Sequence, residues 1–219
     1  MKMLAVFEKG ARLRHIGHLD LMRAMQRALR RSDLPIRYSQ GFSPHILLTF
    51  AAPLSLGNIG KREIMEIPLE KPLQEAYFSR VLSGVLPQDI RIVQVRATDD
   101  QHKSPMALLR AARYQIDFSS ASFTQEELSA FLNQEDITVQ KKTKSGVRPT
   151  DIKPMIYELT SQESSIWTTL SLCEERSCKP ELLLHALAEF CGKPLSQVLI
   201  TRLALFAEKD GCFIPLEDA

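Results

Sequence analysis

The chain has 219 residues, of which 44% are hydrophobic and 25% are charged, with a formal net charge of +2. A chain of this length can hold one large domain or two small domains of about 100 residues each. It contains no run of about 18 apolar residues, and the apolar stretch after Met1 soon meets charged residues, which excludes a membrane span and a signal peptide. We therefore expect a cytoplasmic protein without a membrane partner.

Positive charge is concentrated near the N-terminus. Between Lys9 and His45 there are eight lysine and arginine residues and only two acidic residues, a local charge of +6. The rest of the chain must then carry a charge of −4. A local excess of this size indicates an anionic partner more clearly than the net charge does.

In the first half of the chain the hydrophobic pattern predicts a regular order of elements. It indicates a strand at 3–9, a helix at 18–31, strand character at 36–38 and 46–51, a strand at 62–69, a helix at 72–85 that starts at Pro72, and a strand at 90–95. In the first helix, Met22, Met25 and Leu29 follow helical spacing and should face the core. The order is β-α-β-β-α-β, the ferredoxin-like arrangement.

The same order recurs after a polar boundary at 98–104 and a capped turn at Ser104-Pro105. The elements are a strand at 114–118, a helix after the capping box Thr124–Glu127, strands at 137–142 and 167–172, a helix from Pro180 to Gly192, and a strand at 198–206. We predict an α+β protein of two ferredoxin-like halves packed together, residues 1–97 and 105–219. A single fused α+β domain is the alternative.

The first predicted helix carries a stripe of arginines beside its apolar face. Arg23, Arg27 and Arg30 have i, i+4, i+7 spacing, and Arg31 extends the stripe. Arginine binds phosphate bidentately and stacks on bases. The flanking segments add Arg12, Arg14 and Arg37. This pattern predicts contact with phosphate or nucleic acid, and the alternative is an ordinary solvated helix face.

The loop between the two segments of strand character combines aromatic and polar groups. Gly41 permits positive φ and Pro44 fixes φ, so the loop should have a defined shape. Tyr38 and Phe42 offer faces for base stacking, and Gln40, Ser43 and His45 offer hydrogen-bonding groups. The alternative is that both aromatic residues belong to the core.

A second basic cluster surrounds the turn at Ser145-Gly146, and it predicts either phosphate contact or a solvated hairpin tip. The complete set of predicted RNA-binding residues is Arg12, Arg14, Arg23, Arg27, Arg30, Arg31, Arg37, Tyr38, Gln40, Phe42, His45, Lys141, Lys142, Lys144 and Arg148.

We expect no metal and no cofactor. The four cysteines, Cys173, Cys178, Cys191 and Cys212, form no CxxC pair, and the CxxxCxxC pattern of radical-generating iron–sulfur clusters is absent from the sequence. The sequence contains neither GxxxxGK[ST] nor GxGxxG, so it shows no nucleotide-binding loop. His15, His18, Asp20 and His45 could come together, but their spacing does not impose a metal site or a catalytic pair.

Several segments resemble one uncharacterised bacterial family. They are Gly17-His18-Leu19-Asp20-Leu21-Met22-Arg23, Arg27-Ala28-Leu29-Arg30-Arg31, Gly41-Phe42-Ser43-Pro44-His45 and Pro53-Leu54-Ser55-Leu56-Gly57. Together they are similar to the radical SAM-linked protein family, a domain of unknown function for which no catalytic residues are established. The resemblance implies a partner, because this family is fused to, or encoded beside, cobalamin-binding radical SAM proteins.

From the basic, aromatic surface and this resemblance we predict an RNA-binding accessory module. It would present tRNA or rRNA to a separate radical SAM enzyme. Two alternatives stay open: a metal-independent ribonuclease with His18 or His45 as general base, and a protein-only adaptor whose arginines bind an acidic partner.

Overall fold

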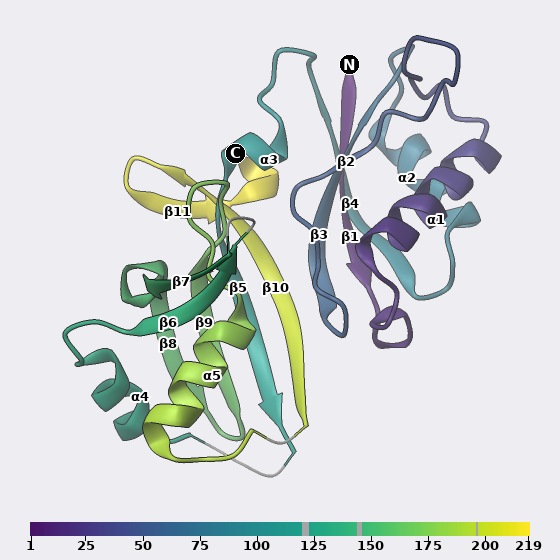
Figure 1. The fold of residues 1–219 in the computed structure, drawn as a ribbon. Helices are drawn as coiled ribbons and strands as arrows, with labels where there is room; N and C mark the ends of the chain where they lie inside the picture. Colours follow the sequence, from purple (N-terminus) through teal and green to yellow (C-terminus); the bar gives the residue numbers. More distant parts are fainter. Residues whose placement is uncertain (120–122, 144–145, 196) are drawn as a thin grey trace. The chain divides into compact units, whose positions relative to one another are not determined.

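The computed structural model describes residues 1–119, 123–143, 146–195 and 197–219 of a mixed α+β protein (Figure 1). The chain forms two compact units, unit 1 from Met1–Leu109 with Ala204–Ala219 and unit 2 from Arg110–Leu203. Among the residues that the structure describes, no helix has the length and apolar character needed to cross a membrane.

Unit 1 is built around a sheet in which β1 is the central strand. Its elements are β1 (Lys2–Lys9), α1 (His18–Arg31), β2 (Thr49–Phe50), β3 (Ile59–Pro68), α2 (Glu75–Val85), β4 (Ile90–Thr98), α3 (Pro105–Leu108) and β11 (Cys212–Pro215). The strand order is β4-β1-β3, and β2 pairs with β3. Strand β1 is antiparallel to both neighbours, with Ala5 opposite Met65 and Val95. Helices α1 and α2 cover one face of this sheet (Figure 1).

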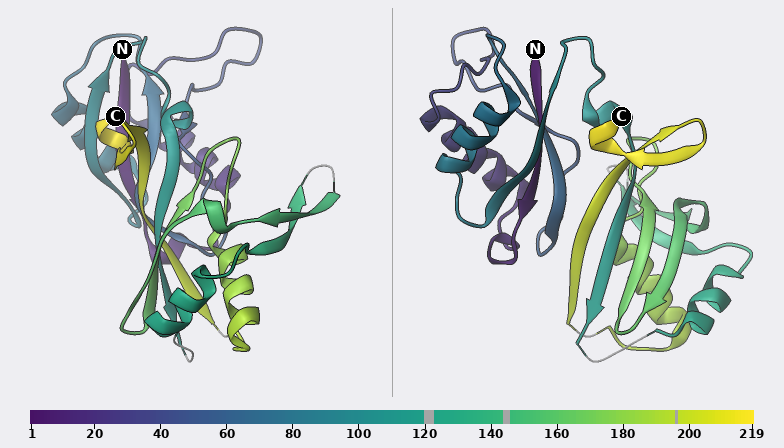
Figure 2. Two further views of the ribbon diagram at one scale, coloured as in Figure 1. Left: turned by 90° about the vertical axis from the view of Figure 1, so that its left-hand side faces the viewer. Right: turned by 180° about the vertical axis from the view of Figure 1, so that it is seen from behind.

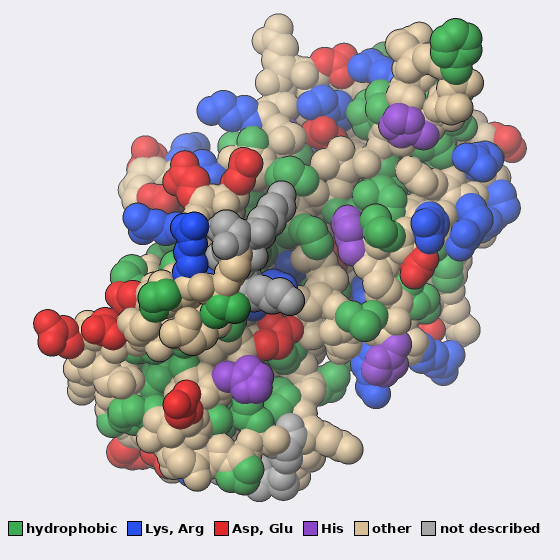
Figure 3. Space-filling view, viewed as in Figure 1, with side chains coloured by type: hydrophobic (Ala, Val, Ile, Leu, Met, Phe, Trp, Pro, Cys, Tyr) green, Lys and Arg blue, Asp and Glu red, His purple; other side chains and the backbone are tan. Residues whose placement is uncertain are grey.

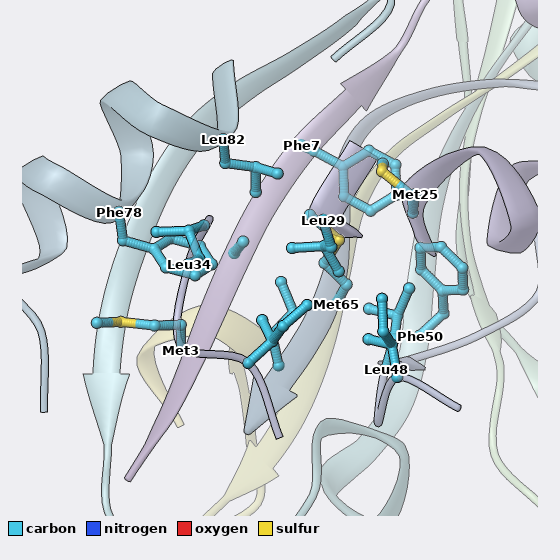
Figure 4. Close-up of a cluster of buried hydrophobic side chains, with 14 of the residues drawn as sticks. Met3, Phe7, Met25, Leu29, Leu34, Leu48, Phe50, Met65, Phe78 and Leu82 are labelled. Carbon is cyan, nitrogen blue, oxygen red and sulfur yellow. The ribbon is translucent and has the colours of Figure 1, made fainter. Parts of the chain in front are cut away.

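The core of unit 1 lies between this sheet and the two helices. Met3 and Phe7 of β1 are fully buried, and they meet Met25 and Leu29 of α1 in one cluster with Phe78 and Leu82 of α2 (Figure 4). Burial of each such side chain stabilises the fold by about 1.5–3 kcal/mol. The predicted core face of the first helix is therefore confirmed for Met25 and Leu29, whereas Met22 is only partly buried.

The opposite face of the same sheet holds the C-terminal segment. Arg62 on β3 lies 2.6 Å from the buried carboxylate of Glu217, and Arg96 on β4 donates a hydrogen bond to the carbonyl of Ala219. Leu4 and Ile64 are buried on this face. Strand β1 is thus buried on both faces, which explains why it reads as a continuous apolar run from Met3 to Phe7.

Two predictions for the first half are wrong in detail. The residues at 36–38 and 46–51 form isolated bridges, Ile36 to Leu69 and Tyr38 to Ile46, followed by the two-residue strand β2. Helix α2 begins at Glu75 after an extended Gln74, so Pro72 precedes the helix. The φ angle that proline fixes also suits extended chain, so a proline alone does not mark the first helical turn.

In unit 2, two helices lie on one face of the strands (Figure 1). Its elements are β5 (Leu109–Phe118), α4 (Gln125–Leu132), β6 (Thr138–Thr143), β7 (Gly146–Asp151), β8 (Ile156–Gln162), β9 (Ser165–Ser171), α5 (Pro180–Cys191) and β10 (Val198–Lys209), of which β10 continues into unit 1. The strand order is β10-β5-β9-β8. The predicted capping box of Thr124 and Glu127 is confirmed, as is the left-handed Gly192 that ends α5.

The prediction for the segment at 137–142 needs a correction. This segment forms β6, which pairs with β7 in a separate two-stranded hairpin, and β8 takes the position beside β9 in the sheet. Figure 2 shows the hairpin projecting from the rest of unit 2. Strand β7 was missed because it is exposed and contains Pro149, which gives it no apolar pattern to detect.

The predicted α+β class is confirmed. The finer prediction of two ferredoxin-like halves, with domains at 1–97 and 105–219, stays a prediction and is taken up below.

Candidate nucleic-acid interface

The outer stripe of α1 carries the arginines that the sequence indicates. Arg23, Arg27 and Arg30 are all exposed, because Leu21, Met25, Ala28 and Leu29 direct the opposite side of the helix into the core. Figure 3 shows basic side chains gathered over α1. Arg23 donates to Asp20 over 3.0 Å, one turn earlier on the helix, and this acid also suits the positive N-terminal end of α1.

Arg27 and Arg30 are the least committed cations of this stripe. Within the described parts of the chain, neither guanidinium group has a hydrogen-bond or ion-pair partner. Like charges three residues apart on a helix repel each other by a few tenths of a kcal/mol when exposed. A bound phosphate would relieve this repulsion and accept their hydrogen bonds.

Other arginines of the predicted set are used within the protein. Arg31 donates to the carbonyl of Val85 over 2.8 Å and so links α1 to the end of α2. Arg37 donates to the carbonyl of Leu69 over 3.2 Å and lies 3.6 Å from Asp100. The N-terminal ammonium of Met1, followed by Arg37, lowers the pKa of the Asp100 carboxyl.

The connection between β1 and α1 contains two further arginines and one buried lysine. Arg12 is exposed at 4.0 Å from Asp89, and Arg14 donates to the ring of His15 over 3.0 Å. Lys9, which contributes to the local charge of +6, is only 1% exposed, and its ammonium donates to the carbonyl of Ile16 over 3.0 Å. Lys9 therefore shapes this connection and is no part of the basic surface.

The loop at 39–45 presents Phe42 fully to solvent. Gly41 adopts a φ of +123°, a conformation that L side chains rarely take. The hydroxyl of Ser39 lies 2.8 Å from Nδ1 of His45 and accepts a hydrogen bond from the His45 N–H, which closes the base of the loop. Phe42 has an exposed fraction of 110%, and Gln40 is exposed as well.

Tyr38 differs from Phe42 in its environment. It is partly buried and packs against the core of unit 1, while its backbone bridges to Ile46. The two aromatic residues that the sequence predicts as stacking platforms therefore have different environments: Tyr38 packs against the core, and Phe42 lies in solvent.

The histidines give no support to a metal or catalytic centre. His18 lies edge-on to Phe50 with ring centroids 5.4 Å apart, and His45 is held by Ser39. Over residues 1–119, 123–143, 146–195 and 197–219, no group of three or more histidine, cysteine or acidic side chains is placed to hold a metal ion.

The second basic cluster lies on the β6–β7 hairpin of unit 2. Lys141 donates to the carbonyl of Ser177 over 2.6 Å, so its ammonium is partly used within the unit, whereas Arg148 is exposed. Lys142 lies on β6, and Lys144 falls outside the described residues.

Two exposed leucines of unit 1 were missed as candidate surface residues in the sequence. Leu19 is 66% exposed and Leu56 is 65% exposed, and the loop of Leu56 is tied to the β1–α1 connection by a hydrogen bond from Gly57 to the carbonyl of Arg14. Leu19 lies four residues before Arg23, so helical spacing alone could have placed it on the outer stripe.

Comparison with curated proteins gives no match. A family model matches residues 2–180, which is most of the chain, and its description is "Uncharacterized protein conserved in bacteria (DUF2344)". The expectation of an uncharacterised bacterial family is thereby confirmed, while the link to radical SAM proteins stays a proposal. The chain belongs to the DUF2344 family of conserved bacterial proteins.

Proposed function

We propose that this protein is an RNA-binding accessory module that presents tRNA or rRNA to a separate, cobalamin-binding radical SAM enzyme. The observation that carries the RNA part is the combination, within unit 1, of the fully exposed Phe42 with the exposed Arg23, Arg27 and Arg30. Recognition of single-stranded RNA uses aromatic faces for base stacking and cations for the phosphates. The partner part rests on the family resemblance described above.

The exposed groups favour a single-stranded or looped RNA over a regular duplex. A ring that stands free in solvent can stack only on a base that is not already stacked between its neighbours. Loops and ends of tRNA and rRNA supply such bases. The arginines on α1 would bind the flanking phosphates. Arg27 and Arg30 have no partner among the described residues, and Arg23 would exchange its exposed ion pair with Asp20 for a phosphate.

Photocrosslinking tests this proposal directly. An oligonucleotide containing 5-bromouridine, irradiated with the full-length protein and digested, should give crosslinked peptides that contain Phe42 or the neighbouring Gln40. A matched reaction with Phe42→Leu, which keeps an apolar side chain without the ring, should lose most of this crosslink. Crosslinks confined to peptides of unit 2 would contradict the proposal.

Two further measurements separate the alternatives. Incubation of labelled total RNA with pure protein would reveal cleavage if His18 or His45 served as a general base. Co-purification of a radical SAM protein from a bacterial lysate, with and without ribonuclease treatment, tests the partner and asks whether RNA bridges the two.

We also propose that each half of the chain, residues 1–97 and 105–219, is a ferredoxin-like module. The support is the strand order: β4-β1-β3 with β2 beside β3 in unit 1, and β10-β5-β9-β8 in unit 2. Both orders correspond to β-α-β-β-α-β connectivity if β8 takes the position of the second strand and the β6–β7 hairpin is an insertion. The proposed domains remain residues 1–97 and 105–219.

A further inference from the structure

Unit 2 contains a groove between one face of α5 and the strand β6. The groove has a volume of about 650 Å³ and Phe131 of α4 at its base. On α5 it is lined by Leu182, His185, Ala186, Glu189 and Phe190. These positions follow i, i+3, i+4, i+7, i+8 spacing, so a single helix face forms one wall.

The other wall is the free edge of β6. It consists of the consecutive residues Ile137, Thr138, Val139 and Gln140. Consecutive side chains of a strand point to opposite faces, so a groove that touches all four must run along the strand edge. Among the described residues, β6 pairs only with β7, which lies at its other edge.

The hydrogen-bond pattern identifies which backbone groups point into the groove. The carbonyl of Ile137 accepts a hydrogen bond from Ile152, on the side of β7. Along an antiparallel strand, the backbone N–H and C=O groups of successive residues point alternately to the two edges of the strand. Those of Val139 therefore also point to β7, whereas those of Thr138 and Gln140 point away from it. Pro149, opposite Gln140, has no N–H to donate and fits this assignment.

Half of the residues that line the groove are apolar, and its acidic residues lie at the exposed rim. Asp136 and Glu189 are exposed, and the residues lining the described groove include no lysine or arginine. Phe190 is 44% exposed, yet its ring is held edge-on to Phe131 at 5.6 Å between centroids. An ordered, exposed aromatic ring beside free strand groups is typical of a binding groove rather than of a solvated surface.

We propose that this groove binds an extended segment of a partner protein as an additional strand on β6. Backbone groups of that segment would pair with Thr138 and Gln140. Alternate apolar side chains would pack on Ala186 and Phe190, and a lysine or arginine between them would meet Asp136 and Glu189. The acidic rim repels phosphate, so this site is distinct from the proposed RNA surface and does not depend on it.

A defined pair of probes tests the proposal. Binding of a fluorescein-labelled octapeptide of alternating valine and lysine to the full-length protein would be followed by anisotropy. A peptide of alternating valine and glutamate is the charge control. We expect the basic peptide to bind at least about tenfold more tightly, and methylation of alternate backbone nitrogens to remove binding, because the added strand needs its N–H groups.

Protein variants locate the binding to the groove. Gln140→Pro removes one N–H that points away from β7, leaves the hairpin bonds in place and should weaken binding about tenfold. Glu189→Lys should have a similar effect, while Glu175→Lys, an equal charge change at an exposed position outside the groove, should have none.

Three outcomes would overturn the proposal: equal binding of both peptides, undiminished binding of the N-methylated peptide, or equal loss of affinity in Glu175→Lys and Glu189→Lys. The circular dichroism spectrum of each variant shows whether it has kept its fold. None of these measurements involves RNA, so they can fail or succeed independently of the proposed function.

Discussion

The two basic regions of the protein, the α1 stripe of unit 1 and the β6–β7 hairpin of unit 2, look alike in the sequence and differ in the structure. On α1 the backbone hydrogen bonds are satisfied within the helix, and Arg27 and Arg30 extend from it without a partner among the described residues. On the hairpin, Lys141 instead binds the carbonyl of Ser177. A count of charges therefore does not distinguish a cation that can bind a ligand from one that the fold already uses.

The same lesson applies to two arginines of unit 1. Arg31 lies one residue after Arg30, yet it binds a carbonyl at the end of α2, and Arg37 binds a carbonyl after β3. Carbonyl groups at the ends of helices and in turns often lack a backbone hydrogen-bond donor, and a nearby guanidinium group can supply one. Helical spacing predicts the face of the helix from which such a side chain extends, but it does not predict which carbonyl group the side chain binds.

The largest expected effect concerns the reactivity of the cysteines. It tests the region around Ser177, whose carbonyl binds Lys141 of the β6–β7 hairpin. Burial raises the pKa of the Cys178 thiol, beside Ser177, to about 12, whereas Cys212 is exposed. At pH 8 the thiolate fraction of Cys178 should be on the order of 10³ times smaller than that of an ordinary thiol. Alkylation followed by mass spectrometry should therefore label Cys212 and leave Cys178 unmodified. Rapid labelling of Cys178 in the native protein would show that this region is open.

Phe42→Ala should give the next largest effect, on RNA affinity alone. Loss of a stacked base costs about 1–3 kcal/mol, and a fully exposed ring contributes no core packing. Isothermal titration would measure the affinity, and thermal unfolding should show an unchanged melting temperature. Phe78→Ala is the matched control in the core and should cost about 3–5 kcal/mol of stability. A drop in melting temperature for Phe42→Ala would place this ring in the core instead.

Replacing Arg27 and Arg30 together should change how RNA binding depends on salt. Each lost phosphate contact flattens the slope of log K against log salt by about 0.7, so the double Ala variant should differ from wild type by about 1.4. The comparison variant is Lys141→Ala with Arg148→Ala, on the hairpin. If that variant flattens the slope as much as the α1 variant, the distinction between the two regions is wrong.

Arg31→Ala should have the smallest effect, and on stability rather than on RNA. It removes one exposed hydrogen bond to the Val85 carbonyl, which is worth at most about 1 kcal/mol. Urea denaturation should show this loss while the salt slope of RNA binding stays at the wild-type value. An altered salt slope with unchanged stability would show that Arg31 contacts RNA instead.

Much of the fold follows from local patterns in the sequence. The bounds of α1 are as predicted, because helical periodicity depends on neighbouring residues only. Strands β7 and β8 were missed, because neither has the alternation of apolar and polar residues that marks a half-buried strand, and β7 also contains Pro149. In the candidate site, the exposure of Arg27 and Arg30 was predictable from spacing. The use of Arg31 and Arg37 by distant carbonyls was not.

The central claim is that unit 1 binds RNA through exposed arginines and Phe42, and the salt dependence of RNA binding tests it most directly. The measurement is the affinity of the wild-type protein for a labelled single-stranded RNA across a salt series that starts at about 50 mM, where electrostatic attraction is strongest. Three contacts, from Arg23, Arg27 and Arg30, predict measurable binding and a slope of about −2. The absence of binding at the lowest salt, or binding with a slope near zero, would contradict the account.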